Sequence, residues 1–114
     1  MNRIDSINSN PKQSLTLVLE DGSKFSFSME YVENQRGWFY TLVYGEFILY
    51  NRRIVASPNM LRQFRNIIPF GIACTTQDRY EPIFIDDFSK DRATMYILNE
   101  EDVVSVEEFL VNVG

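Results

Sequence analysis

The chain has 114 residues, of which 45% are hydrophobic and 24% charged, and its formal net charge is -5. This size and composition predict one soluble globular domain, and the negative charge argues against binding to nucleic acid or to anionic membranes. The sequence has no histidine and one cysteine. These counts exclude histidine-based nucleophile systems, histidine-ligated metal sites and an internal disulfide, so we expect neither a metal nor a cofactor.

The chain divides by composition into three parts. Residues 1–12 are rich in Asn and Ser and predict a flexible N-terminal arm, residues 13–98 a β domain, and residues 99–114 an acidic segment packed on or flanking that domain. No stretch is apolar and long enough to span a bilayer, and the first residues lack the apolar core of a signal peptide. We therefore expect the product to stay in the cytosol where it is made.

A hairpin is predicted at the start of the β domain. Residues 14–19 and 24–31 each alternate apolar and polar side chains, which is typical of half-buried strands, and the Asp-Gly pair at 21–22 marks a turn between them. A two-residue loop would split the apolar faces of the two strands. A three-residue loop with the glycine in the left-handed conformation would place Leu17 opposite Phe25, and this loop is our prediction.

A third strand is predicted over residues 37–44, which are rich in aromatic and β-branched side chains. The Gly-Glu pair at 45–46 suits a type II′ turn that would place Tyr44 opposite Phe47 in the following strand. The aromatic content of this region indicates that both of its faces are covered.

The next segments predict short elements of both kinds. Residues 52–55 read as a short strand after a turn near Asn51. Ser57 as N-cap and Pro58 at the first position predict a helix of about two turns. Residues 68–74 then alternate again and predict a strand.

The end of the chain leaves one choice open. Residues 77–92 are polar and turn-like, and residues 93–98 predict another strand. In the acidic segment from 99 to 114, Asn99 or Ser105 would cap a terminal helix, whereas the valines favour a strand. Helix and strand both remain possible for this segment.

These elements predict a mainly β fold, a single-domain antiparallel barrel or sandwich of short strands with one short helix and a possible C-terminal helix. Most aromatic side chains would then belong to the core. The alternative is a stacking platform for sugars or bases built from Trp38 and the tyrosines at 31, 40, 44 and 50. The alternation and the acidic charge favour the core.

Charged side chains supply the candidates for partner binding. An anion or an acidic partner could dock on the arginines, and copies of the chain could pair head to tail, basic patch against acidic tail. The simpler alternative is a solvated face whose arginines offset a helix dipole. The basic candidates are Arg52, Arg53, Arg62 and Arg65, and the acidic candidates are Glu100, Glu101, Asp102, Glu107 and Glu108.

The sequence offers little for catalysis. The acidic loop at 85–92 lacks the Gly and Glu of a calcium-binding EF-hand, and no spacing singles out a hydrolytic carboxylate pair. Cys74 lies on the apolar side of its predicted strand, which indicates an inert buried thiol. Phosphate-binding glycine motifs and the Gly-x-Ser-x-Gly motif are absent. We therefore expect a protein that is not an enzyme.

A series of short motifs runs in order along residues 13–98. The motifs are Gln-x-Leu-x-Leu at 13–17, Asp-Gly at 21–22, Trp38, Pro-Asn-Met-Leu at 58–61, Ile-Pro-Phe-Gly at 68–71, Asp-Asp-Phe at 86–88 and the strand from Arg92 to Leu98. Their order resembles the small baseplate plug proteins of contractile-tailed bacteriophages, of the cyanophage type. The acidic segment after Asn99 is longer than this resemblance leads us to expect.

The resemblance implies a noncatalytic structural subunit of the virion that plugs or organises the central hub and tube channel of the tail baseplate. Its implied partners are other baseplate, hub and tail-tube proteins, and its implied site before assembly is the host cytoplasm. Copies of the chain are expected to associate within the assembly, whereas nucleic acid and membrane are not expected as partners. The family brings no catalytic residues.

Two other functions stay open. A carbohydrate- or receptor-binding β module of a tail would use exposed aromatic side chains, such as Trp38, in a groove. A carboxylate-based hydrolase would need a cleft that holds an acid of raised pKa.

Overall fold

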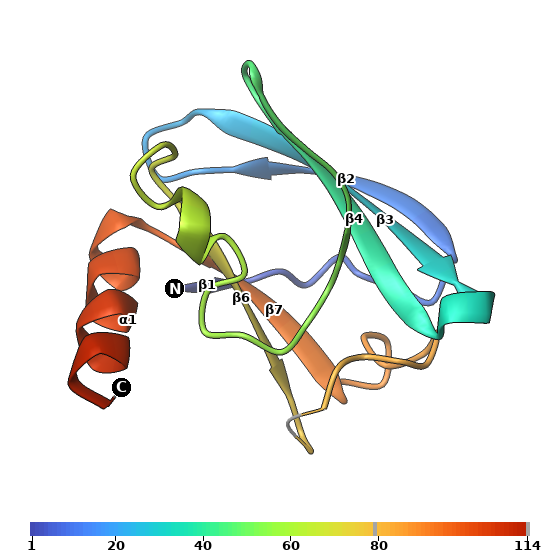
Figure 1. Cartoon of the computed structure of the whole chain (residues 1–114). Helices are drawn as coiled ribbons and strands as arrows, with labels where there is room; N and C mark the ends of the chain where they lie inside the picture. Colours follow the sequence, from blue (N-terminus) through green and yellow to red (C-terminus); the bar gives the residue numbers. More distant parts are fainter. Residues whose placement is uncertain (79, 114) are drawn as a thin grey trace.

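Two antiparallel sheets face each other, and one helix lies outside them (Figure 1). The computed structural model describes residues 1–78 and 80–113. The strands follow the order β2-β3-β4-β5 in one sheet and β1-β7-β6 in the other, so the fold is a sandwich and not a barrel. The elements are β1 (Asn2–Arg3), β2 (Lys12–Val18), β3 (Lys24–Val32), the 3-10 helix η1 (Glu33–Gln35), β4 (Gly37–Tyr44), β5 (Phe47–Arg53), the 3-10 helix η2 (Arg62–Phe64), β6 (Gly71–Thr76), β7 (Ala93–Leu98) and α1 (Glu100–Val113).

The β2–β3 hairpin confirms the predicted three-residue loop. Leu17 pairs with Phe25, and the amide of Leu19 donates to the carbonyl of Ser23 at 2.8 Å, which leaves three residues between them. Gly22 has a φ of 88°, a conformation that other residues rarely adopt. This register places the apolar side chains of both strands on the face that meets the second sheet.

The β4–β5 hairpin confirms one prediction and corrects another. Tyr44 pairs with Phe47 across the turn as expected. The predicted turn near Asn51 and the separate strand at 52–55 are wrong, because β5 continues to Arg53. Asn51 has a φ of 54° and donates its amide to Thr41 Oγ1 at 3.1 Å, beside a shift in the pairing register. The unusual backbone is therefore a β-bulge within one strand.

The helix predicted from Ser57 is wrong, because the segment forms only the 3-10 helix η2. Ser57 does not cap a helix but pairs with Cys74 as an isolated antiparallel bridge, with two backbone hydrogen bonds of 2.9 Å. The start of the segment therefore joins the edge of the β6–β7 sheet beside β6, where a helix N-cap was expected.

Asn59 shapes the turn that follows and explains why β6 starts later than predicted. Its buried side-chain oxygen accepts hydrogen bonds from the amides of Leu61, at 3.0 Å, and Ile72, at 3.3 Å. The strand predicted from Ile68 begins at Gly71 instead. The loop before Gly71 is held by backbone hydrogen bonds of its turns and by the Asn59 side chain.

The start of the chain, expected to be a loose arm, is attached to the second sheet. Arg3 pairs with Tyr96 of β7, and the amide of Ile4 donates to the carbonyl of Met95 at 2.9 Å. Ile4 is 5% exposed and belongs to the core. A single apolar residue in a polar segment is a weak signal in sequence, but here it anchors the segment.

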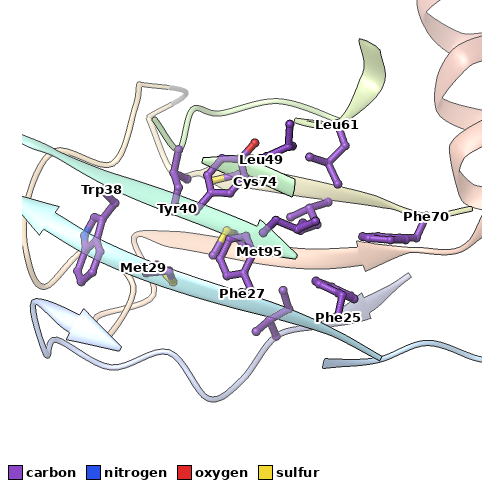
Figure 2. Packing of buried hydrophobic residues seen from close by; sticks show 14 of the residues in the cluster. Phe25, Phe27, Met29, Trp38, Tyr40, Leu49, Leu61, Phe70, Cys74 and Met95 are labelled. Atoms are coloured by element: carbon purple, nitrogen blue, oxygen red, sulfur yellow. The ribbon is translucent and has the colours of Figure 1, made fainter. Parts of the chain in front are cut away.

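The core lies between the sheets and contains Trp38 and several other large aromatic side chains, as predicted, together with aliphatic ones (Figure 2). The rings of Phe25 and Phe70 stack with centroids 4.5 Å apart. Trp38 is fully buried and donates from Nε1 to the carbonyl of Phe84 at 3.2 Å. Cys74 is also buried, and burial raises its pKa to about 12. The stacking platform is therefore excluded for Trp38, whose ring is core.

The C-terminal segment is a helix, which settles the choice left open by the sequence. Asn99 is its cap: the Asn99 side chain accepts from the amide of Asp102 at 2.8 Å, and the Asp102 carboxylate accepts from the amide of Asn99 at 3.1 Å. Val103 packs with Ala73 and Leu98 on the outer face of the β6–β7 sheet. Within the described ranges, no helix is long and apolar enough to cross a membrane.

Candidate interaction surface

Three of the charged candidates meet within the chain. Arg62, on η2, donates to the Glu107 carboxylate of α1 through Nε at 2.9 Å and a terminal nitrogen at 2.8 Å, and Arg65 Nε lies 3.6 Å from the same carboxylate. Hydrogen bonds from Arg62 lower the pKa of Glu107. The basic and acidic groups that we expected to meet between copies therefore pair inside one copy, where they hold α1 beside η2.

The other two arginines serve different contacts. Arg52 lies over the ring of Phe64, with its guanidinium carbon 5.3 Å from the ring centroid. Arg53 forms an ion pair with Glu81, 3.0 Å from Nε to Oε2, and donates to the backbone carbonyls of residues 35 and 36. Each of the four arginines thus contacts its own chain, and the structure divides them between η2 and the β4–β5 region.

The acidic residues at the start of α1 have two roles. The Asp102 carboxylate accepts the hydrogen bond from the Asn99 amide at the helix cap, whereas Glu100 and Glu101 line a hollow of about 340 Å³. Glu20 and Asp21, from the tip of the β2–β3 hairpin, line the same hollow. Four carboxylates from two distant parts of the sequence are therefore gathered at one end of α1.

This hollow is one end of a longer depression along α1, which we call the α1 groove. Its wall opposite the helix is formed by residues 65–70, and its middle and far sections share Arg65, Asn66, Val103 and Val104. The far section encloses about 430 Å³. The helix side of the groove is formed by Glu100, Glu101, Val103, Val104, Glu107, Glu108 and Val111.

Apolar side chains in and beside the groove are unusually exposed. Val104 is 56% exposed, Val111 68%, and Ile67 on the opposite wall 68%. Sequence reasoning identified the acidic residues of this segment but missed Ile67, because its exposure depends on the turn that follows η2. Alternating charge and exposed apolar area make the groove a better candidate for protein contact than the arginines.

A buried ion pair, which the sequence did not identify, fixes the loop at 85–92. Asp87 is 2% exposed and receives two hydrogen bonds from Arg92, from Nε at 2.6 Å and a terminal nitrogen at 2.7 Å, and one from the amide of Phe84 at 2.8 Å. Burial alone would raise the pKa of Asp87, but the Arg92 and Phe84 hydrogen bonds lower it overall. Across residues 1–78 and 80–113, no group of three or more metal-binding side chains is assembled.

The motif residues noted in the sequence also hold loops in place. Gln13 donates from its side-chain nitrogen to two carbonyls within residues 8–10, both at 2.9 Å. A side chain at Gly71 would place its Cβ 2.5 Å from the Asn59 oxygen, so glycine is required there. With the Trp38 and Asp87 hydrogen bonds described above, these contacts fasten loops to the sandwich. The motifs therefore describe how the fold is held together.

A comparison with protein families matches the chain to a known family. The family model described as "Cyanophage baseplate Pam3 plug gp18" matches residues 1–101 of the chain. No curated protein matches the chain. The matched range contains both sheets and only the first two residues of α1, so the rest of the helix, including Val104, Glu107 and Val111, lies outside the match.

Proposed function

The chain belongs to the cyanophage baseplate plug family, and on this premise we propose that it plugs or organises the central hub and tube channel of a contractile-tail baseplate by packing against other proteins. Family membership makes it a structural protein of the phage tail baseplate. The match over both sheets is the observation that carries the proposal, because it covers the whole sandwich.

The way the sandwich is built supports a passive blocking role. Its core is filled by packed aromatic and aliphatic side chains, and the loops at 8–10, 58–61 and 84–92 are fastened by side-chain hydrogen bonds. Such a body resists deformation, since opening any loop breaks several bonds at once. On contraction of the tail, the interfaces around the plug would then change before the plug itself unfolds.

We further propose that the chain acts without catalysis. Over the described ranges, the carboxyl groups with a shifted pKa are Asp21, Asp87 and Glu107, and in all three the pKa is lowered. A carboxylate hydrolase needs one acid whose pKa is raised. A carbohydrate-binding function through Trp38 finds no support either, because that ring is buried.

The proposed partners are other baseplate, hub and tail-tube proteins, with copies of the chain as further neighbours. The chain would be made in the host cytoplasm and then built into the virion. Neither nucleic acid nor membrane is proposed as a partner, in keeping with the net charge of -5. Among the sequence candidates, Glu100, Glu101 and Glu108 are the ones we assign to contact with partners, because they lie along the groove.

The test is to prevent synthesis of the chain by the phage. A stop codon early in the frame is expected to yield tails that lack this chain and release or fail to retain DNA, and the wild-type chain supplied from a plasmid should restore infectivity. Phage with synonymous changes at the same codons serve as the control. Particles that keep their DNA and infect normally without the chain would contradict the proposal.

A further inference from the structure

We propose that the α1 groove binds a segment of another baseplate protein that carries lysine or arginine next to apolar side chains. The identity of the partner as a baseplate protein rests on the proposed function, whereas its chemistry rests on the groove alone. The chain's family match ends at Glu101, so the part of the groove formed by residues 103–111 of the helix lies outside the match, and the rest of the groove lies within it.

The apolar part of the groove indicates that something covers it. Val104 and Val111 are seven positions apart and so lie on one side of α1, and Ile67 lines the groove from the opposite wall. All three are more than half exposed. Soluble proteins seldom leave neighbouring apolar side chains uncovered in a depression, and such a patch usually marks a binding site.

The charge around the groove indicates the sign of the partner. The helix has five carboxylates and no basic residue, and the hairpin tip adds Glu20 and Asp21 at one end. Glu107 is already paired with Arg62 and with Arg65, the basic residue on the opposite wall of the groove, but Glu100, Glu101 and Glu108 form no ion pair with any described residue. A partner with positive charge at the hairpin end and apolar side chains toward Val111 would match both parts.

The groove is already formed in the free chain. The double hydrogen bond between Arg62 and Glu107 fixes the distance between η2 and the helix, and Val103 fixes the helix on the sheet. Figure 1 shows η2 next to α1, with the helix outside the two sheets. A partner segment therefore has a site to enter without a prior rearrangement of the helix, which lowers the entropic cost of binding.

A second copy of the chain fits this site less well. One place where a basic residue lies beside an exposed apolar one is the β2–β3 hairpin, where Lys24 pairs with Val18. The tip of the same hairpin carries Glu20 and Asp21, which would approach the carboxylates of the groove. Like charges at close range oppose this arrangement.

The first test measures binding of a model peptide to the purified full-length chain by fluorescence anisotropy at low salt. The probe is a labelled 14-residue peptide of leucine and lysine, with leucines at helical spacing, and the comparison peptide has glutamate in place of every lysine. We expect the lysine peptide to bind at least about tenfold more tightly than the glutamate peptide. Equal affinities for the two peptides would overturn the proposal.

Variants with matched controls locate the binding. Val104→Ser is expected to weaken lysine-peptide binding about fivefold, because it removes exposed apolar surface from the groove. Val18→Ser is the control, since Val18 is 57% exposed and lies on β2. Glu100→Gln with Glu101→Gln should also weaken binding about fivefold, while Glu33→Gln with Glu46→Gln, outside the groove, should not. Unchanged affinity in the Val104 variant would place the peptide elsewhere and overturn the proposal.

The second test uses assembled particles. Val104 is replaced by the photoreactive p-benzoylphenylalanine, and the crosslinked segment is identified by mass spectrometry. A segment of another baseplate protein with Lys or Arg beside apolar residues supports the proposal, whereas a crosslink to a second copy or to an acidic segment overturns it. Peptides of the chain itself, detected in the same mass spectra, report whether the chain is present, and the same replacement at Tyr50, an exposed aromatic on β5, is the control for crosslinking outside the groove. Absence of the chain from particles would refute the proposed function. The peptide-binding experiment would still test, on the purified chain, whether the groove binds a basic and apolar segment.

Discussion

The sandwich and the helix α1 differ in how completely their apolar side chains are buried within the chain. In the sandwich, Phe27, Trp38 and Met95 are fully buried between the sheets. In α1, Val103 is buried against β6 and β7, while Val104 and Phe109 are 56% and 62% exposed. The sandwich therefore has an enclosed core of its own, although Ile48 and Tyr50 on β5 are exposed, whereas Val103 is the side chain through which the helix is buried.

The same division separates what the chain shares with its family from what it adds. The family match covers the sandwich and ends at Glu101, near the start of α1. The motif residues inside the match, such as Asn59 and Asp87, fasten loops. The helix side of the groove from Val103 to Val111 lies beyond the match, whereas the opposite wall at 65–70 and the hairpin tip lie within it. The groove therefore joins a part of the chain that the family shares with a part that lies outside the match.

The largest expected difference between the two regions is in thiol reactivity. Burial raises the pKa of Cys74 to about 12, so at pH 8 the folded chain should react with a thiol reagent about a thousandfold or more slowly than the chain unfolded in guanidinium. A thiol on the helix, Ser105→Cys in a Cys74→Ala background, should react at once, because Ser105 is exposed. Rapid labelling of Cys74 in the native protein would contradict the burial described here.

Removal of a core side chain should affect stability next most strongly. Phe27→Ala is expected to lower the free energy of unfolding by about 4 kcal/mol, since Phe27 is fully buried and its ring stacks on Tyr40. Tyr50→Ala, at a side chain that is 80% exposed, should change it by less than about 0.5 kcal/mol. Urea unfolding followed by tryptophan fluorescence measures both values, and similar losses in the two variants would be inconsistent with this account of the core.

The buried Asp87–Arg92 pair should have a smaller effect that depends on pH. Asp87→Asn is expected to cost about 3 kcal/mol at pH 7, because Arg92 loses its buried partner. The folded-state pKa of Asp87 is lowered, so the pair stabilises the protein above the carboxyl's unfolded pKa, and this contribution is lost as the pH falls through the folded-state pKa.

The measurement is the free energy of unfolding at pH 7 and near pH 3. The wild-type chain should lose more stability over this range than Asp87→Asn. Asp86→Asn, which removes only a surface pair with Lys90, is the neighbouring control and should follow the wild type. An equal acid dependence for the wild type and Asp87→Asn would show that the pair does not contribute in this way.

The smallest expected effect concerns the pairing of α1 with η2. Glu107→Gln should increase hydrogen exchange in α1 and leave β3 and β4 unchanged, because the Arg62 hydrogen bonds hold the helix and not the sandwich. Sodium chloride should increase α1 exchange in the wild type more than in the variant. Lys12→Gln, which removes a 3.9 Å surface pair with Glu30 on the sheet, is the control. Faster exchange throughout the sheets of Glu107→Gln would mean that the two regions are not separate.

Local patterns were enough to predict most of the sheet structure. Alternation set the strands, and the requirement to keep apolar faces together selected the three-residue loop and the pairing of Leu17 with Phe25, which the structure confirms. The cap at Asn99 was one of two positions that the sequence allowed. These features depend on residues that are close in sequence, so their physical causes are visible there.

The features that were missed depend on distant partners. Ser57 has the chemistry of a helix cap, yet its backbone pairs with Cys74, and that contact prevents the predicted helix. Asp87 lies in a segment that the sequence predicts to be turn-like, but in the structure its carboxylate accepts hydrogen bonds from Arg92 and from the Phe84 amide. The pairing of Arg62 with Glu107, 45 residues apart, likewise appears only when the helix packs. Local propensity cannot anticipate contacts that the tertiary fold creates.

Cryo-electron microscopy of intact tails, at a resolution that shows side chains, tests the central claim most directly. We predict that the sandwich lies at the centre of the baseplate with its fold unchanged, and that a segment of a neighbouring protein with basic and apolar side chains fills the groove beside Val104 and Glu100. A tail whose centre is built without this chain, or one in which the groove of the bound chain faces open solvent, would contradict the account.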